Sequence, residues 1–142
     1  MFVEGITMGL AERRAVKEFQ DKAYPGLKKQ VDKAAGFSVP IEVKWDSLAS
    51  EGQSHLYADS YPKVFFEPLV KAFTRIAVDD MGKKALKEGL KEVRIANTKG
   101  SYSCSGFTFK DGVLDIDHEP CSNVDDIEQR AEGIQKLLEN GL

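Results

Sequence analysis

Residues 107–117 read FTFKDGVLDID, and this stretch decides the fold class. Apolar and polar residues alternate on both sides of Asp111-Gly112, which is the period of a strand with one buried face. A type I′ turn needs positive φ at both central residues, and Asp-Gly tolerates that conformation. The stretch therefore predicts an antiparallel hairpin with an apolar inner face made by Phe107, Phe109, Leu114 and Ile116.

The two-residue turn also fixes the register of this hairpin. In that register the acids of its second strand lie on the outer face, opposite small residues. The expected cross-strand pairs are Lys110 with Val113, Thr108 with Asp115, Gly106 with Asp117 and Cys104 with Glu119.

A long amphipathic helix is predicted over residues 10–35. Pro25 lies inside it, but the apolar stripe keeps its phase across the proline, which favours one kinked helix over two separate ones. Gly36 is expected to end it. The stripe consists of Val16, Phe19, Ala23, Leu27, Val31 and Ala34.

The middle of the chain predicts a strand, a long loop and a buried helix. Residues 37–45 alternate apolar with polar positions, and Pro40 indicates an edge strand or a bulge because it has no N–H to donate. Residues 47–61 are rich in Ser, Gly and Asp and are expected to be irregular, which marks them as the first place to look for function. Residues 64–77 are apolar on two sides, typical of a buried helix, with Pro68 at its first position.

The remaining elements complete the expected order α-β-α-α-β-β-β-α. Asp79 or Asp80 caps a short helix ending near Gly89, a second strand begins at Val93, Lys99–Ser101 forms a turn, and Asn123 caps the last helix. The predicted fold is a single α+β domain over residues 1–142. Its sheet has three or four mainly antiparallel strands, with helices packed on one face. The opposite face is expected to be polar and exposed to water, and it carries Glu42, Lys44, Thr108, Asp115 and Asp117.

Composition and charge exclude several classes of protein. An apolar fraction of 42% and a charged fraction of 30% are ordinary for a chain that folds alone. The net charge of −3, with both signs interspersed, argues against nucleic-acid partners. No apolar run approaches the roughly 20 residues that span a bilayer, so no membrane partner and a cytoplasmic location are expected.

No strong catalytic or nucleotide-binding motif occurs, and no cofactor is expected. The loop at 47–61 carries His55, Tyr57, Asp59 and Tyr61 at alternate positions, which share one face if the segment is extended, and Trp45 lies just upstream. Such a group could supply a proton shuttle, a carboxylate and two phenols to a ligand or partner. The alternative is a solvated loop that its tyrosines anchor to the body of the protein.

The acids Asp115, Asp117 and Glu119 form the second candidate group. Three carboxylates along one strand face could hold a calcium or magnesium ion. The alternative, which we favour, is the solvent face of a half-buried sheet, with Lys110, Lys44 or Arg94 offsetting the charge.

His118 and the two cysteines are assigned structural roles. His118 falls on the inner face of its strand, where a hydrogen-bonded histidine is more common than a catalyst. Cys104 and Cys121 are diagonal to each other in the expected ladder, at a separation of about 7 to 8 Å that does not suit a disulfide. We therefore expect two free thiols.

The function expected from the sequence is that of a small non-catalytic interaction or regulatory protein, for which inhibition of a protein partner is one mode of action. The alternative is a small-ligand binder or enzyme, in which His55 is the acid or base, Asp59 orients it and Tyr57 or Tyr61 holds the substrate. The absence of catalytic motifs favours the first. The oligomeric state stays open.

Overall fold

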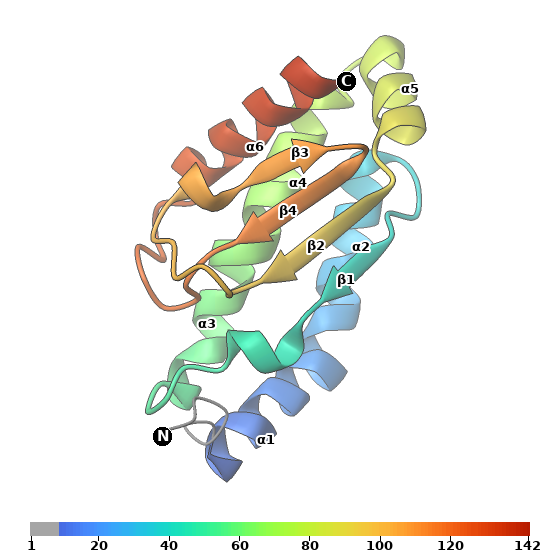
Figure 1. Cartoon of the computed structure of the whole chain (residues 1–142). Helices are drawn as coiled ribbons and strands as arrows, with labels where there is room; N and C mark the ends of the chain where they lie inside the picture. The colour runs from blue at the N-terminus through green and yellow to red at the C-terminus, as the bar shows by residue number, and fades with distance from the viewer. Residues whose placement is uncertain (1–8) are drawn as a thin grey trace.

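A mixed four-stranded sheet lies at the centre of the computed structural model, which describes residues 9–142. The strands are β1 (Ile41–Val43), β2 (Glu92–Ala96), β3 (Thr108–Lys110) and β4 (Val113–Asp117), in the spatial order β1-β2-β4-β3 (Figure 1). β1, β2 and β4 run parallel, and β3 alone is antiparallel. The number of strands and the mixture of helix and strand agree with expectation, but a mainly antiparallel sheet is wrong.

The hairpin of β3 and β4 follows the predicted register. Lys110 pairs with Val113 and Thr108 with Asp115, and φ is positive at both Asp111 (53°) and Gly112 (81°), as a type I′ turn requires. The ladder does not extend to the two further pairs expected at Gly106 and Cys104. It stops there because residues 104–106 form a 3-10 turn and β4 ends at Asp117.

β4, and not β3, is the neighbour of β2, because β4 lies between the two. It runs antiparallel to β3 and therefore in the same direction as β2. Residues 97–107 carry the chain past the place of β4 to the outer edge, so the expected turn at 99–101 is not a hairpin. The Asp117 carboxylate holds this loop: it accepts from the N–H groups of Thr98 (2.9 Å) and Lys99 (3.1 Å) and from the Thr98 hydroxyl (2.6 Å).

The first helix is continuous and kinked, as predicted. α1 (Leu10–Glu18) and α2 (Tyr24–Ala35) are joined by a π-helical turn, Phe19–Ala23, in which the Tyr24 N–H donates to the carbonyl of Phe19, five residues back. This change of register lies directly before Pro25, which has no N–H to offer. Gly36 ends the helix with φ of 88°.

A second long helix also contains a π-helical turn. α3 (Tyr57–Tyr61) and α4 (Glu67–Ile76) flank a π-helical turn at Pro62–Phe66, and the Glu67 N–H donates to the Pro62 carbonyl. The helix begins well before the predicted residue 64, and Pro68 lies inside it rather than at its start. Residues 47–61 are therefore not irregular throughout, because two 3-10 turns (Trp45–Leu48 and Ser54–Leu56) precede α3.

Two shorter predictions differ in outcome. α5 (Asp80–Gly89) has Asp79 as its cap, with the Gly82 N–H donating to the Asp79 carboxylate (2.8 Å), as expected. α6 (Ile127–Gly141) is not capped by Asn123, whose side chain instead donates to the carbonyl of Tyr102 (2.7 Å).

β1 is shorter than the predicted strand at 37–45. The Val39 N–H donates to the Asp32 carboxylate (2.9 Å) instead of joining the ladder, and the next residue, Pro40, has no N–H to contribute. β1 is an edge strand, as Pro40 indicated.

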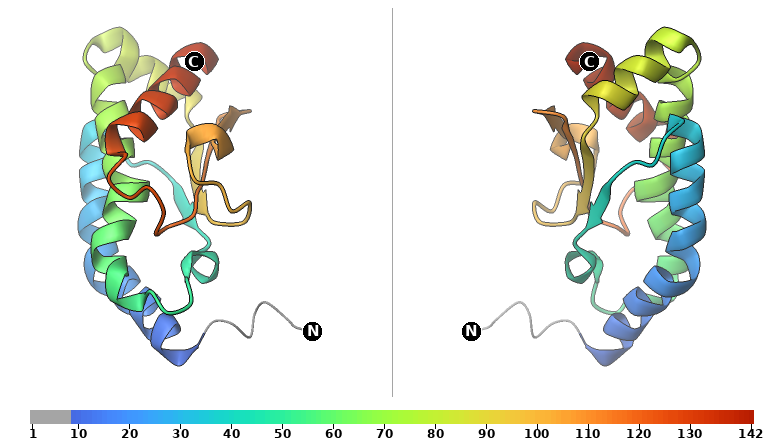
Figure 2. Two further views of the ribbon diagram at one scale, coloured as in Figure 1. Left: turned by 90° about the vertical axis from the view of Figure 1, so that its left-hand side faces the viewer. Right: turned by 90° about the vertical axis from the view of Figure 1, so that its right-hand side faces the viewer.

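Helices cover one face of the sheet and leave the other bare. Figure 2 shows α1–α2, α3–α4 and α6 on the same side and, of residues 9–142, no α-helix on the opposite side. The core fills the space between the two layers. Its fully buried members include Val64, Phe65, Phe66, Leu69, Phe73, Val93, Ile95, Leu114, Ile134 and Leu138.

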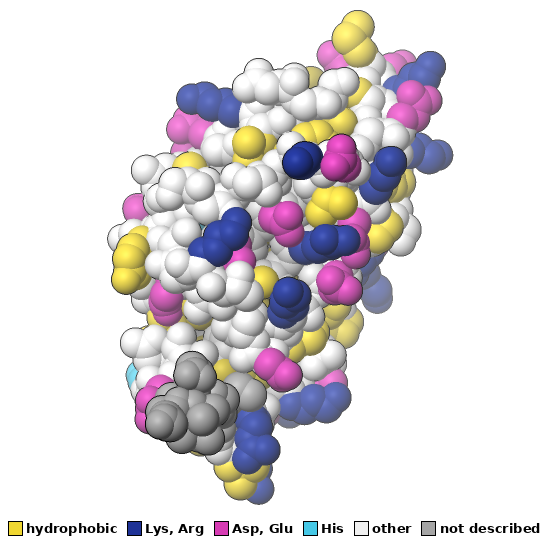
Figure 3. All heavy atoms as spheres, viewed as in Figure 1, with side chains coloured by type: hydrophobic (Ala, Val, Ile, Leu, Met, Phe, Trp, Pro, Cys, Tyr) yellow, Lys and Arg dark blue, Asp and Glu magenta, His cyan; other side chains and the backbone are white. Residues whose placement is uncertain are grey.

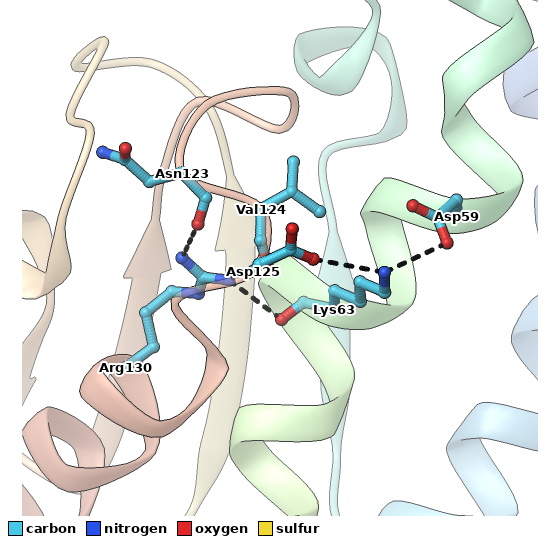
Figure 4. A network of polar contacts seen from close by, with 6 residues as sticks. All are labelled: Asp59, Lys63, Asn123, Val124, Asp125 and Arg130. Carbon is cyan, nitrogen blue, oxygen red and sulfur yellow. Dashed lines mark hydrogen bonds and ion pairs between the residues drawn. The ribbon is translucent and has the colours of Figure 1, made fainter.

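Arg130 of α6 ties this helix to the second long helix. Its side chain is fully buried, and its guanidinium donates to the carbonyls of Asn123 (2.7 Å), Val124 (2.7 Å) and Lys63 (3.2 Å) (Figure 4). In the π register the carbonyl of Lys63 would receive the N–H of residue 68, which is a proline. Pro68 thus leaves an acceptor that Arg130 satisfies.

We expect Arg130→Met to lower the free energy of unfolding by about 3 to 5 kcal/mol, because it leaves three carbonyls without their donor in the interior. Urea denaturation measures this loss. The matched control is Arg75→Met, which removes an ion pair at the surface with Glu128 (2.7 Å) and should change little. A loss no larger than that of the control would contradict the role given to Arg130.

Candidate functional site

Tyr57 and Tyr61 are buried anchors of the preceding loop. Their rings stack with centroids 4.7 Å apart. The Tyr57 hydroxyl accepts from the N–H of Ser50 (2.7 Å) and donates to the Ser50 carbonyl (3.0 Å), while the Tyr61 hydroxyl donates to the carbonyl of Leu48 (2.6 Å). Burial raises the pKa of both phenols. The two hydroxyls are therefore engaged with the backbone of the loop, the anchoring arrangement weighed as the alternative.

His55 and Asp59 lie at the surface in different settings. His55 lines a groove of about 350 Å³ between the first helix and α3. Asp59 instead pairs with Lys63 (3.3 Å), next to Asp125 (Figure 4). The expected shared face of an extended segment is wrong, because the chain is helical from Tyr57 onward and residues two apart in a helix point about 200° apart.

Trp45 lies away from the groove that His55 lines. Its ring packs edge-on against Tyr24, with centroids 5.1 Å apart, and against Phe19 at 6.1 Å. The indole is half-buried, and its exposed part lines a second groove beside β1. The predicted group of five residues is thus divided among the core, two grooves and an ion pair.

The three acids of the predicted metal site do not converge. Asp117 is buried and bonded to the loop after β2. Glu119 lies beyond the end of β4 and accepts from the Cys121 N–H and from the hydroxyls of Ser122 (3.0 Å) and Ser50 (3.3 Å). Asp115 alone stays on the sheet face. Within residues 9–142, no group of three or more metal-binding side chains gathers.

His118 is fully buried beneath the end of β4. Its Nδ1 lies 2.6 Å from the carbonyl of Glu119, so Nδ1 carries the proton, and the ring packs near Phe107. Burial lowers the pKa of His118, and the positive charge of Arg130 lowers it further. The imidazole is therefore neutral near pH 7 and serves the structural role expected of it.

The two cysteines contact different helices. Cys104 packs against Gly133 of α6, and the sulfur of Cys121 lies 3.8 Å from the hydroxyl of Ser60 in α3. Both are free cysteines, and the diagonal arrangement in one ladder is wrong because neither lies in a strand. Burial raises the pKa of Cys121, so its thiol is protonated and a weak nucleophile near pH 7.

The bare face of the sheet carries a group of charged side chains around a hollow. We call it the open face and define it by Glu42, Lys44, Arg94, Lys99 and Asp115. A hollow of about 280 Å³ lies among these residues and Thr98. Figure 3 shows side chains of both signs gathered over the strands.

The sheet register orders these charges. Glu42 of β1 lies beside Arg94 of β2, which lies beside Asp115 of β4, so a cation separates two acids. Arg94 also bonds to Glu92 of its own strand (2.8 Å), and this bond raises the pKa of the guanidinium. Glu42 and Lys44 form no ion pair with any residue in the described range 9–142. Their charges are available to a partner.

Sequence reasoning placed Glu42, Lys44 and Asp115 on this face correctly and missed two features. Lys99 reaches the hollow from the loop after β2, which the predicted tight turn did not allow. Asp117 was expected at the surface, but its carboxylate is occupied by hydrogen bonds from that loop. A prediction that β2 and β4 are parallel neighbours would have found both features, because the carboxyl ends of the two strands then lie together.

Comparison with known proteins gives no further assignment. No family model, no curated protein and no solved structure matches the chain. Among residues 9–142, no helix has the length and apolar character to cross a membrane. Any function assigned to the open face therefore has to be argued from the geometry and charges of this chain.

We expect His118→Gln to reduce the loss of stability in acid. In the unfolded chain the imidazole titrates near pH 6.5, whereas burial lowers its pKa in the folded chain. Below about pH 6.5 the unfolded chain binds an extra proton, so the free energy of unfolding falls as pH drops toward the folded pKa.

Urea denaturation at about pH 7 and about pH 5 measures how much of the pH dependence of the free energy of unfolding comes from His118. The control is His55→Gln, which replaces the other histidine of the chain. If the pH difference of the wild type persists unchanged in His118→Gln, the inferred neutral, buried state of this histidine is wrong.

Proposed function

We propose that this chain is a non-catalytic protein-binding module whose open face receives a partner protein. The observation that carries the proposal is the bare, hollowed sheet face, on which Lys44, Arg94 and Lys99 lie among Glu42 and Asp115. Glu42, Lys44 and Arg94 are exposed on this face, so their charges are free to serve recognition. Occluding a surface of the partner, and so inhibiting it, is the mode of action that we propose for it.

The alternation of charge supports a protein as the partner. A polyanion such as nucleic acid would be bound by a one-signed basic surface, whereas the open face places acids on both sides of Arg94. Protein interfaces match positive with negative groups, and arginine is enriched in them. A partner with an acidic group for Arg94 and basic groups for Glu42 and Asp115 fits this pattern.

The surroundings of the reactive side chains support a non-catalytic role. General acid–base and nucleophilic catalysis need a base within hydrogen-bonding reach of the group it activates. Here the Tyr61 hydroxyl is bonded to backbone, Asp59 is paired with Lys63, and His118 is buried. Within residues 9–142, no ion pair joins His55 to an acid.

Charge reversal on the open face tests the proposal. We expect affinity capture from the native cell lysate with the wild-type chain to enrich a protein that Arg94→Glu retains at least about ten-fold less well, because a reversed charge opposes the matching group of the partner.

The matched control is Lys29→Glu, at an exposed position of α2, and the measurement is quantitative mass spectrometry of the captured proteins. Equal enrichment by wild type and Arg94→Glu, or no protein above a blank resin, would count against the open face.

A small-ligand site is the second candidate, and the groove beside His55 favours it. This groove has a volume of about 350 Å³ and is lined by both apolar and charged side chains. Concave sites of this size suit small ligands. Asp59 and Tyr61 do not contribute to it, so the site is smaller than the one expected from the sequence. Its lining residues are Ala15, Glu18, Phe19, Lys22, Ala23, Ser54, His55, Tyr57 and Ala58.

Ligand-observed NMR with a fragment library tests this second candidate. Fragments that occupy the groove should lose their saturation-transfer signal with His55→Ala and keep it with Asp59→Ala, because Asp59 lies outside the groove. Hits that respond to neither substitution, or to both alike, would remove the groove from consideration.

A further inference from the structure

The free edge of β1 is a candidate interaction surface that adjoins the open face and shares Glu42 and Lys44 with it. β1 is an outer strand of the sheet, and in the right-hand view of Figure 2 no strand or helix of the part of the chain that the structure describes lies in front of it. The carbonyl of Pro40 accepts from Val93 (2.8 Å), and the N–H of Lys44 donates to Ile95 (2.9 Å). Because successive residues alternate in direction, the N–H and C=O groups of Ile41 and Val43 point away from β2.

A groove runs beside this edge and exposes apolar surface. It has a volume of about 530 Å³, and Val43 and Trp45 line it together with Gln20 of the first π-helical turn. Trp45 is held from behind by its contacts with Tyr24 and Phe19, so it presents a fixed aromatic surface. Rigid, half-exposed tryptophans beside unpaired backbone are typical of binding hot spots.

The charges of β1 indicate what binds to its free edge. Glu42 and Lys44 flank Val43 with opposite charges, so the strand is complementary to a second copy of itself. In an antiparallel pair of two copies with Val43 opposite Val43, Glu42 of each copy lies opposite Lys44 of the other. The two ion pairs lie on the open-face side, where both residues are exposed, and the Val43 residues exchange backbone hydrogen bonds at the two-fold axis.

Neighbouring registers are disfavoured by the same charges. Moving the axis by one residue in one direction places Glu42 opposite Glu42, and in the other direction places Lys44 opposite Lys44 and Glu42 opposite Asp46. Like charges directly opposite each other destabilise a strand pair. On the free edge the N–H of Val39 is already bonded to the Asp32 carboxylate, which ends the ladder at one end, and the 3-10 turn at Trp45 ends it at the other, so the short edge fits one register.

We propose that a second copy of this chain pairs with β1, joining the two sheets into one continuous eight-stranded sheet with two-fold symmetry. Such an interface is closed, because the same edge serves both copies and no further edge of this kind remains. The open faces of the two copies then lie on the same side of the joined sheet. The dimer does not rest on the proposed function, since it uses the edge rather than Arg94.

A charge-swap series tests the dimer. Sedimentation equilibrium over a concentration series should give twice the chain mass for the wild type. We expect Glu42→Lys and Lys44→Glu each to raise the dissociation constant at least about ten-fold, because each substitution turns two attractive pairs into repulsive ones.

The double swap Glu42→Lys with Lys44→Glu should restore the wild-type dissociation constant. An equimolar mixture of the two single variants should form the heterodimer, because each then meets the opposite charge. Restoration by these two arms also establishes that the single variants are folded. Lys17→Glu, at an exposed ion pair in α1, is the control and should leave the dimer unchanged.

Three outcomes overturn the proposal. They are a wild-type chain that is monomeric at every concentration, a dimer whose dissociation constant neither single variant changes, and single variants that fail to associate when mixed. A monomer whose β1 edge instead takes up a strand of another protein also belongs to the first of these. Loss of the dimer would leave the capture experiment on the open face unaffected.

Discussion

The buried guanidinium of Arg130 joins α6, the loop that leads into α6, and the second long helix. It donates to two carbonyls of the loop that leads into α6 and to the carbonyl of Lys63 in the second long helix. The last of these acceptors exists because Pro68 has no N–H to occupy it. A helix-breaking residue on one helix thereby creates the acceptor for a cation on another. The position of α6 over the sheet depends on this link.

The two π-helical turns extend the same constraint through the helical layer. Each lies directly before a proline, and each bends a long helix without ending it, so both helices follow the twisted sheet (Figure 2). The turns also meet: Phe19 of the first stacks against Phe66 of the second, with ring centroids 6.3 Å apart. The helices thus gather on one side around an aromatic centre, and this arrangement leaves the opposite face of the sheet bare.

Local chemistry made parts of this fold predictable. Asp111-Gly112 forms the hairpin turn, Gly36 ends the first helix in a left-handed conformation, and Asp79 caps α5. Each of these features depends only on nearby residues. Strand order depends on contacts between distant segments, which period and propensity do not encode. One signal was present: the helical residues 57–89 lie between β1 and β2, and a helical crossover favours parallel strands. Reading the 47–61 segment as a loop concealed how much of that crossover is helical.

The candidate site shows why strand order matters more than residue type here. The alternation of β1 and β4 correctly placed Glu42, Lys44 and Asp115 on the outer face, but alternation alone cannot say which strands are neighbours. In an order that brought β4 next to β1, acids of the two strands would adjoin and repel. With β2 between them, Arg94 separates Glu42 from Asp115, so the central strand neutralises the face across its width. The topology that was not predicted is therefore what places a cation between the two acids of the open face.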